Sequence, residues 1–585
     1  MKLFAQLGWF FRREWRHYLG SVFLLIIIAL LQLVPPRLVG IIIDSGVTGN
    51  TSRRLLALCL GIMAFTAVLV YGLRYFWRML LFGAAYRLAV ELRNRLYNLF
   101  SQQLPGFYLR HRTGDLMARA TNDVDRVVFA AGEGVLMLVD SLVVGSSVLL
   151  VMSLQISWQL TLLALLPMPL MAVLIKRDGQ RLHQRFRGAQ AAFSSLNNQA
   201  QENLTSIRMI KAFGLEQYQS VRFAAVATKA GDQNMHLARV DARFDPTIYL
   251  AVGLSNLLAV SGGSWLVISG SMTLGQLTTF IMYLGLMIWP MLALAWMFNI
   301  VERGSAAYKR INQTLEERLE IEDGDLSLPT GQGTLKVAIN SFYYPHAKNP
   351  ALKDINLTLT PGQMLGVCGP TGSGKSTLLA LLLRQFDVID GEICFHDLPL
   401  TALALDQWRS RLAVVSQMPF LFSDSIASNI AFGRPESPAD KIEEVARLAC
   451  IHEDILNLPQ GYKTEVGERG VMLSGGQKQR LAIARALLLE AEILVLDDAL
   501  SAVDGLTEHN ILRNLRCWVN HRTVIITAHR LSSLQDASQI VVLKRGRISQ
   551  QGNHFSLLQQ QGWYRNMYRC QQLETALEQA YNPRR

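Results

Sequence analysis

Charged residues are scarce in this chain of 585 residues, since they make up 17% of it whereas hydrophobic residues make up 50%. A disordered chain carries more charge and a fibrous chain carries a strict repeat, so both classes are excluded. The mean hydropathy of +0.21 is also too high for a soluble enzyme of this length. Part of the chain is therefore expected to lie in lipid, and the length predicts about three or four compact units.

Cysteine is also rare, with six residues, and no two of them form a CxxC pair. Neither a disulfide framework nor a zinc site is therefore expected. Five of the six lie in the more polar second half, where scattered reduced thiols are typical of a cytosolic domain. We expect no secretory signal peptide, because the first apolar run is too long for one and lacks a small-residue cleavage pattern.

Long runs without charge, or with a single charge, dominate the first half of the chain. A membrane-spanning helix needs about 20 apolar residues. Two of the runs hold one span each, and the other two hold a pair of spans separated by a polar break near residues 155–158 or 269–273. The sequence therefore predicts six spans, in residues 19–43, 55–73, 127–175 and 246–301.

Basic residues gather on one side of these spans. The N-terminus and the loops after the second and fourth spans are rich in Arg and Lys, whereas the opposite side carries only Arg53 and Arg54. Positive residues stay in the cytoplasm, so both termini are predicted to be cytoplasmic. This pattern accounts for the net charge of +12 without nucleic acid, and no nucleic-acid partner is expected.

Three features of the membrane half need interpretation. Trp9, Phe10 and Phe11 stand beside three arginines, which predicts an amphipathic helix at the membrane surface. Asp140 is expected near the inner face of the bilayer and not in a proton relay. Met and aromatic residues gather in the sixth span, where ordinary helix packing is favoured over a wall for lipophilic substrates. They are Tyr283, Met287, Trp289, Met291, Trp296, Met297 and Phe298.

A soluble α/β domain is predicted from about residue 334. In it an apolar strand, residues 364–368, leads into GPTGSGKS, which matches GxxxxGK[ST] between a strand and a helix. Backbone N–H groups of such a loop surround a phosphate, Lys375 reaches the terminal phosphates, and the Ser376 hydroxyl ligates Mg²⁺. The predicted site consists of Gly369, Pro370, Thr371, Gly372, Ser373, Gly374, Lys375, Ser376 and Thr377.

A second acidic element supports a nucleotide site. Residues 493–496 form an apolar strand that ends in Asp497 and Asp498. Ligands of open α/β sheets bind at the carboxyl ends of the strands. Asp497 is therefore expected to bind Mg²⁺ through water, and the two elements together predict a nucleotide-hydrolysing domain.

Further motifs resemble those of ATP-binding cassette (ABC) transporters. Residues 473–477 read LSGGQ, the family signature, while Gln417, residues 501–504 and His529 match the Q-loop, D-loop and switch histidine. Six spans ahead of one cassette resemble a type IV half-exporter of the bacterial multidrug-resistance-like kind. The resemblance implies coupling helices in residues 113–125 and 210–214, and a segment at 464–470 that touches the membrane domain.

The resemblance also implies roles for single residues. ATP is the expected substrate and Mg²⁺ the expected cofactor, with Ser376, Gln417 and Asp497 around the metal. Tyr344 stacks on adenine, and His529 holds the γ-phosphate during hydrolysis. The γ-phosphate of the opposite cassette is bound by Ser474, Gly475, Gly476 and Gln477.

One position departs from the family pattern. The residue after the Mg²⁺-binding aspartate is usually a catalytic Glu, and here it is Asp498. The shorter side chain withdraws the carboxylate by about 1 Å, and a misplacement of that size costs about 100-fold in rate. Because the signature is intact, we expect a heterodimer with a partner half-transporter that has Glu at this position; the alternative is that Asp serves as well as Glu.

The predicted architecture is an α-helical membrane domain fused to an α/β P-loop cassette. Residues 1–310 hold the spans and coupling loops, 311–333 a linker, 334–575 the cassette and 576–585 a tail. The predicted function is ATP-driven export of lipophilic or amphipathic compounds across the bacterial inner membrane by alternating access. A lipid flippase of the same architecture is the first alternative, and an importer or a scaffolding membrane ATPase is disfavoured by the fused domains and the coupling segments.

Overall fold

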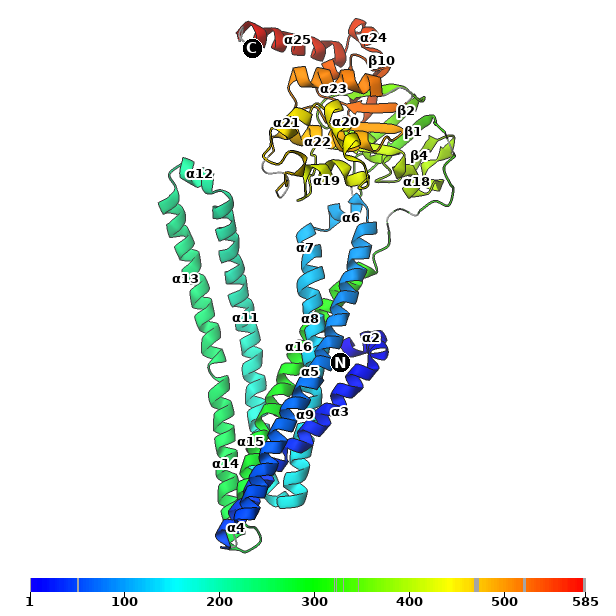
Figure 1. Cartoon of the computed structure of the whole chain (residues 1–585). Helices are drawn as coiled ribbons and strands as arrows, with labels where there is room; N and C mark the ends of the chain where they lie inside the picture. Colours follow the sequence, from blue (N-terminus) through cyan, green and yellow to red (C-terminus); the bar gives the residue numbers. More distant parts are fainter. Residues whose placement is uncertain are drawn as a thin grey trace. The chain divides into compact units, whose positions relative to one another are not determined.

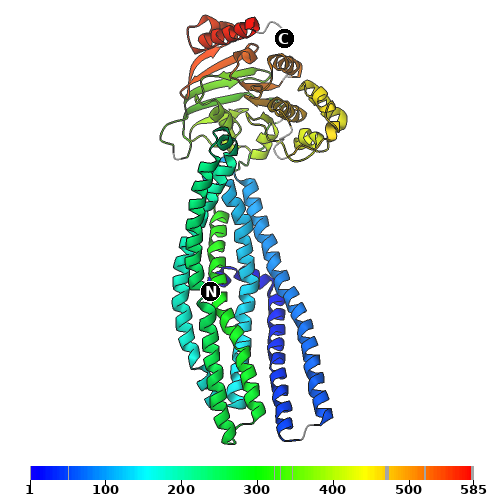
Figure 2. The ribbon, with the colours of Figure 1, turned by 90° about the vertical axis from the view of Figure 1, so that its left-hand side faces the viewer.

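The computed structural model divides the chain into two compact units, each described here by itself (Figures 1 and 2). Residues 1–101 and 114–317 form a helical unit, and residues 102–113 and 318–585 form a unit of helices and strands. The structure describes residues 2–49, 52–319, 321, 323–329, 331–345, 347–467, 473–518 and 522–581.

Six helices of the described residues are long and apolar enough to cross a membrane, which confirms the predicted number of spans. The breaks predicted near residues 155–158 and 269–273 are also confirmed, and Ser157 and Thr273 cap the helices that follow them. The spans consist of α3 (Trp15–Gln32) with α4 (Val34–Val47), α5 (Arg53–Gln102), α7 (Thr113–Ala118) with α8 (Val124–Phe129) and α9 (Val135–Val151), α10 (Trp158–Leu165) with α11 (Pro167–Thr205), α13 (Glu216–Asp241) with α14 (Phe244–Ile268), and α15 (Leu274–Leu286) with α16 (Ile288–Leu315).

The first and sixth spans are interrupted inside their apolar stretches. In the first span α3 ends before Leu33, and Pro35 and Pro36 follow, which have no N–H to continue the ladder. The carbonyl of Leu33, the N-cap residue of α4, also accepts a hydrogen bond of 2.6 Å from the hydroxyl of Tyr283. In the sixth span the interruption falls at Met287, shortly before a proline.

Beyond these interruptions, α4 and α15 approach each other closely. A Cβ on Gly275 would overlap the carbonyl oxygen of Gly40, so backbone meets backbone there. The Asp44 carboxylate accepts hydrogen bonds of 2.7 Å from the backbone N–H of Gly275 and from the hydroxyl of Thr273. Small residues and a capped helix start therefore fasten the first span to the sixth.

The N-terminal segment is helical, as the sequence predicts, and forms α1 (Lys2–Gln6) and α2 (Gly8–Arg13). Leu3, Leu7 and Phe10 are at most 2% exposed and pack into the core of the helical unit. Trp9 and Phe11 are half-buried, and a location at the membrane surface stays a prediction.

The loops after the second and fourth spans each contain a short helix. Residues 113–125, expected to hold a coupling helix, instead begin the third span, because the helix is continuous from Thr113 through Phe129. The short helix of that loop is α6 (Pro105–Arg110), which Pro105 starts and extended His111 ends. The second, α12 (Ile207–Ala212), joins α11 and α13 and overlaps the expected segment 210–214.

Residues 102–113 group with the cassette and not with the other helices of the membrane unit. Within the cassette unit the Phe107 side chain of α6 is fully buried, whereas Leu109 is 71% exposed. The α6 segment is therefore packed into the cassette unit through one side of its single turn.

The cassette contains a four-stranded antiparallel sheet and a six-stranded, mainly parallel sheet, in the orders β2-β1-β4-β5 and β10-β9-β3-β8-β7-β6. Separate apolar clusters cover the faces of the larger sheet. The strands are β1 (Leu335–Phe342), β2 (Leu352–Leu359), β3 (Met364–Cys368), β4 (Asp390–Phe395), β5 (Leu398–Pro399), β6 (Leu412–Val415), β7 (Ile493–Asp497), β8 (Thr523–Thr527), β9 (Gln539–Lys544) and β10 (Arg547–Gly552).

The helices of the cassette stand between and beyond these strands. The helix α16 ends at Leu315, inside the linker expected at residues 311–333, and α25 continues through residue 576, where a tail was expected. The helices are α17 (Lys375–Leu382), α18 (Leu405–Ser410), α19 (Ile426–Ile430), α20 (Ala439–Leu448), α21 (His452–Leu456), α22 (Gly475–Leu488), α23 (Gly505–Trp518), α24 (His554–Gln559) and α25 (Trp563–Tyr581).

The close contact between α4 and α15 generates a stability prediction. Gly275→Ala should destabilise the membrane unit by about 1–3 kcal/mol, because the new methyl group meets the rigid backbone of Gly40. Gly61→Ala is the matched control, since nothing lies within 4 Å of a Cβ there. Thermal unfolding of the purified chain in detergent measures both, and equal midpoints would contradict the contact.

Candidate nucleotide site

Two positions of the phosphate loop require glycine, because of their backbone conformation and because a side chain would clash there. Gly369 and Gly374 have φ values of +144° and +105°, in the left-handed region. A Cβ on Gly369 would overlap the carbonyl oxygen of Leu543, and one on Gly374 would lie 2.6 Å from the Leu352 side chain. Because α17 begins directly after Gly374, its first N–H groups face the loop and form an anion-binding end.

The ammonium group of Lys375 lies over the same loop. It donates hydrogen bonds to the carbonyl oxygens of Gly369 (2.9 Å) and Pro370 (3.2 Å), and the residue is only 9% exposed. Burial lowers the pKa of Lys375, while the nearby Asp498 and Asp497 act in the opposite direction. A cation in this position is available to the terminal phosphates of a nucleotide.

The surroundings of three hydroxyl groups, in the loop and at the start of α17, indicate whether the loop fits a phosphate and a metal ion. The Ser373 hydroxyl is buried and has no hydrogen-bond partner among the described residues, so it is suited to an oxyanion. Ser376 is exposed on the first turn of α17, and Thr377 accepts a hydrogen bond of 3.2 Å from Tyr344. The loop therefore fits ATP. Mg²⁺ would be held by Ser376 and Asp497 together with phosphate oxygens, since it requires about six oxygen ligands.

Tyr344 occupies a half-buried position beside the loop. Its ring contacts Phe342 and Phe386 edge-on, with centroids 5.3 Å apart in both pairs. The hydrogen bond to Thr377 orients the ring next to the phosphate loop. This location agrees with an aromatic side chain that contacts the base of a bound nucleotide.

The acidic pair stands at the end of β7. Thr527 of β8 donates a hydrogen bond of 2.7 Å from its hydroxyl to Asp497 and accepts one of 3.0 Å from the backbone N–H of Asp498. Asp498 has a φ of +47°, and its carboxylate lies 3.5 Å from the side-chain amide nitrogen of Gln417. The structure therefore brings the acidic pair and Gln417 together.

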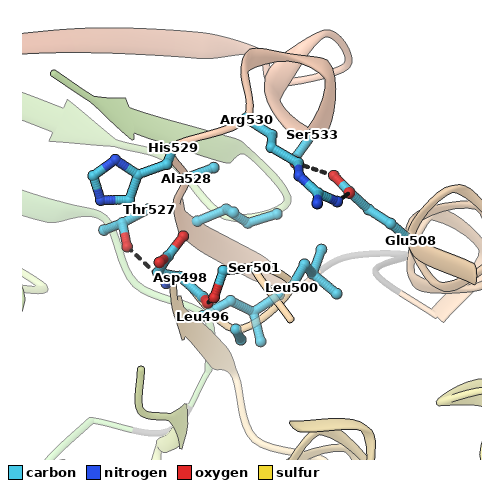
Figure 3. A pocket seen from close by; sticks show the side chains of 12 residues that line it. Leu496, Asp498, Leu500, Ser501, Glu508, Thr527, Ala528, His529, Arg530 and Ser533 are labelled. Carbon is cyan, nitrogen blue, oxygen red and sulfur yellow. Dashed lines mark hydrogen bonds and ion pairs between the residues drawn. The ribbon is translucent and has the colours of Figure 1, made fainter. Parts of the chain in front are cut away.

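Asp498 and His529 line one cavity of about 180 Å³ (Figure 3). The imidazole of His529 is exposed at the end of β8, and Figure 3 shows it on the side of the cavity where Thr527 lies. The phosphate loop, the acidic pair, Gln417 and His529 all follow the carboxyl ends of neighbouring strands, β3, β7, β6 and β8.

The wall of this cavity contains an ion pair between Arg530 and Glu508, which the sequence did not predict. Arg530 donates hydrogen bonds to the carboxylate of Glu508 (2.9 Å) and to the carbonyl of Val503 (3.0 Å). Glu508 is 4% exposed and also accepts a hydrogen bond from Ser533. The D-loop is thereby attached to the residue that follows His529.

The signature segment lies at the N-terminus of α22. Ser474 and Gln477 form a reciprocal capping box, with hydrogen bonds of 3.2 and 3.0 Å between side chain and backbone. The Gln477 amide also donates to Asp454 at 3.1 Å. A Cβ on Gly476 would lie 2.8 Å from the carbonyl oxygen of Ala502, while Gly475 is less confined. The N-terminus of α22, where backbone N–H groups point out of the helix, is suited to bind an anion.

Gln479 connects the signature helix to the D-loop. Its buried side chain accepts a hydrogen bond of 2.9 Å from the N–H of Ala502 and donates one of 3.2 Å to Ser501. Within the described residues, no hydrogen bond joins Ser474–Gln477 to the phosphate loop. The sequence-predicted residues therefore form two groups in one chain.

The exporter-like segment at residues 464–470 is described only in part. Thr464 accepts a backbone hydrogen bond of 3.0 Å from Ile426, and Val466 donates one of 2.9 Å to Asp424. Residues 468–470 lie outside the described residues. Next to the phosphate loop, burial raises the pKa of Cys368 to about 12, so its thiol is neutral and serves packing.

Comparisons with known proteins cover both units. Two family models match, described as ABC transporter transmembrane region over residues 18–291 and ABC transporter over residues 352–501. The Multidrug resistance-like ATP-binding protein MdlA of Escherichia coli strain K12 is 67% identical over 99% of this chain and 98% of its own length. An ATP-dependent lipid A-core flippase of Syntrophus aciditrophicus is 32% identical over 86% of this chain and 84% of its own. The solved structure of a bacterial Atm1-family ABC exporter with ATP bound matches with a TM-score of 0.77 and 26% identity, over 96% of this chain and 98% of that chain.

The position of Lys375 predicts its effect on nucleotide binding. Lys375→Ala should weaken ATP binding by roughly tenfold or more, because a buried phosphate cluster loses a charge-assisted hydrogen bond. Lys353→Ala, an exposed lysine on β2, should leave the affinity unchanged. Titration of both purified variants with ATP at fixed salt provides the measurement, and equal affinities would show that the loop does not bind the phosphates.

Proposed function

The chain belongs to the ABC transporter family, and from this premise we propose that it is one half of a heterodimeric exporter of lipophilic or amphipathic compounds. It is an ATP-hydrolysing, multi-pass membrane transporter of the multidrug-resistance type. The proposed site of action is the bacterial inner membrane, with both termini in the cytoplasm, where the Arg-rich loops belong. Transport proceeds by alternating access, driven by ATP bound between two cassettes.

The observation that carries the heterodimer is the mismatch between Asp498 and the signature segment. Asp498 replaces the Glu that usually polarises the attacking water, and its carboxylate is one methylene shorter. Ser474, by contrast, has its complete capping box. In a head-to-tail dimer Ser474 completes the ATP site of the partner, whereas the site of Lys375 and Asp498 stays impaired. A partner half-transporter with Glu at this position restores one competent site.

Ion pairs and hydrogen bonds between the third and sixth spans support the transmission of cassette movement to the membrane unit. Arg310 of α16 pairs with the buried Asp123 through hydrogen bonds of 2.6 and 2.8 Å, and Arg119 bonds to Asp115 (2.7 Å) and to Thr314. These pairs join the cytosolic parts of the third and sixth spans. Paired charges with two hydrogen bonds hold a defined geometry, so the two helices would move together.

A lipid flippase of the same architecture is the second candidate. The match to a lipid A-core flippase favours it, at a lower identity than the match to the multidrug-resistance-like protein. The two functions differ in what stimulates ATP turnover. Phospholipids would stimulate a flippase in reconstituted vesicles, whereas a panel of lipophilic drugs would stimulate the proposed exporter.

The proposed dimer predicts an asymmetric response of the co-purified pair. Ser474→Ala should abolish most ATP turnover, because it disables the competent site, while Asp498→Asn should change turnover little. Asp406→Asn, an exposed residue of α18, is the control for handling and folding. Phosphate release by the pair measures all three. Brisk hydrolysis by this chain alone that Asp498→Asn abolishes would refute the heterodimer.

The buried side of α6 predicts a coupling defect. Phe107→Ala should lower substrate transport several-fold and leave ATP affinity intact, because it removes a fully buried ring from the segment between the second and third spans. Leu109→Ala on the exposed side of α6 is the matched control and should transport normally. If ATP affinity fell together with transport for Phe107→Ala, α6 would belong to the nucleotide fold instead of the coupling path.

A further inference from the structure

A cavity of about 500 Å³ lies within the helical unit, between the first, second, third and sixth spans. Most of its lining is apolar, and the described lining includes Leu31, Val144, Met282 and Leu286. Its polar lining side chains are those of Gln32, Thr66, Arg74 and Asp140, together with the indole of Trp289. A volume of this size accommodates a ligand of drug or lipid-fragment size.

Both interrupted spans reach this cavity at their interruptions. Pro35 and Pro36 follow the break of the first span, and Trp289 and Pro290 follow the break of the sixth. Irregular backbone at membrane depth is tolerated where protein buries it or where it lines a cavity, because lipid offers no hydrogen-bond partners. Two broken helices that meet at one cavity mark a built site and not a packing defect.

The charged groups of the lining are Arg74 and Asp140, from neighbouring spans. The Asp140 carboxylate lies near the indole of Trp289 and the guanidinium group of Arg74, and all three line the cavity. Arg74 is exposed, and the described residues give it neither a hydrogen bond nor an ion pair. Ionisable residues in membrane spans are costly and typically face a ligand path.

The two ends of the cavity differ in polarity. Counted from Arg53 at the start of α5, Thr66 lies about 20 Å along the helix and Arg74 about 32 Å, at 1.5 Å per residue. The hydrocarbon core is about 30 Å thick, so Arg74 stands at its cytoplasmic edge and Thr66 deeper in the membrane. The cavity therefore has a charged end at the inner leaflet and an apolar end toward the middle of the bilayer.

We propose that this cavity binds an amphiphile whose head group carries both a negative and a positive charge. The anionic group pairs with Arg74, the cationic group approaches Asp140, and the apolar part occupies the end near Met282. A head group with both charges makes a charge-assisted contact with each of the two side chains, whereas a head group with a single charge makes only one such contact. As a statement about the transported compound, the inference rests on the proposed export function; binding itself depends neither on the partner nor on ATP.

The test uses four amphiphiles with the same dodecyl chain and different head groups. The full chain is placed in phosphatidylglycerol nanodiscs and titrated, below micelle-forming concentrations, with dodecylphosphocholine, dodecyltrimethylammonium, dodecyl phosphate and dodecyl maltoside. We expect dodecylphosphocholine to bind about tenfold more tightly than each of the others, as one additional charge-assisted contact provides. Calorimetry reads the binding directly.

Variants identify the two side chains. Arg74→Gln should weaken dodecylphosphocholine binding about tenfold and make dodecyltrimethylammonium the preferred ligand, whereas Asp140→Asn should make dodecyl phosphate preferred. Arg78→Gln and Glu133→Gln remove charges from the same two spans outside the cavity lining and should leave the order of affinities unchanged. A reversal of preference is not an effect that general destabilisation produces.

Replacing half of the nanodisc lipid with phosphatidylethanolamine separates the two sources of such a head group. Competition with dodecylphosphocholine identifies a membrane phospholipid as the ligand, and unchanged binding identifies a dissolved amphiphile. Equal affinity of wild type for dodecyl maltoside and dodecylphosphocholine would overturn the proposal, even where a variant fails to fold. Normal binding without transport by the co-purified pair would instead overturn the export function.

Discussion

The nucleotide site depends on the register in which β3, β8 and β7 pair. Val367 and Asp497 both stand opposite Thr527, so the phosphate loop and the acidic pair leave the sheet at the same level. The Thr527 hydroxyl then bridges Asp497 and the backbone of Asp498. A shift of one residue in β8 would turn this side chain to the other face and separate the carboxylates from Lys375.

Backbone hydrogen bonding imposes the corresponding constraint on the membrane unit. Each interruption of a span frees carbonyl groups, which lipid cannot satisfy. At the first interruption Tyr283 donates a hydrogen bond to the carbonyl of Leu33, and on the far side of the interruption Asp44 accepts hydrogen bonds from the start of α15. The first and sixth spans are thus fastened beyond their breaks, and the cavity with Arg74 and Asp140 lies at the breaks. One half of this helix pair, α4 with α15, is held by close backbone contact, and the cavity opens where the pair is interrupted.

Much of both units could be predicted from contiguous residues. Long apolar runs predict spans because length alone decides whether a helix crosses the bilayer. Pro105 indicates a helix start at residues 105–110, but the resemblance to exporters placed the coupling helix at residues 113–125, which begin the third span instead. For the N-terminal helices the sequence predicts an amphipathic helix, but amphipathicity does not reveal that Leu3, Leu7 and Phe10 pack against the spans.

The sequence by itself determined the six spans, the phosphate loop and the acidic strand, because each is a local pattern whose chemistry depends on adjacent residues. Only the tertiary structure decided that Gln479 holds Ser501 and Ala502, that Glu508 holds Arg530, and that Arg74 and Asp140 share a cavity. These partners come from different helices and loops. Packing of separate elements brings them together, and no periodicity along the chain records which surfaces will meet.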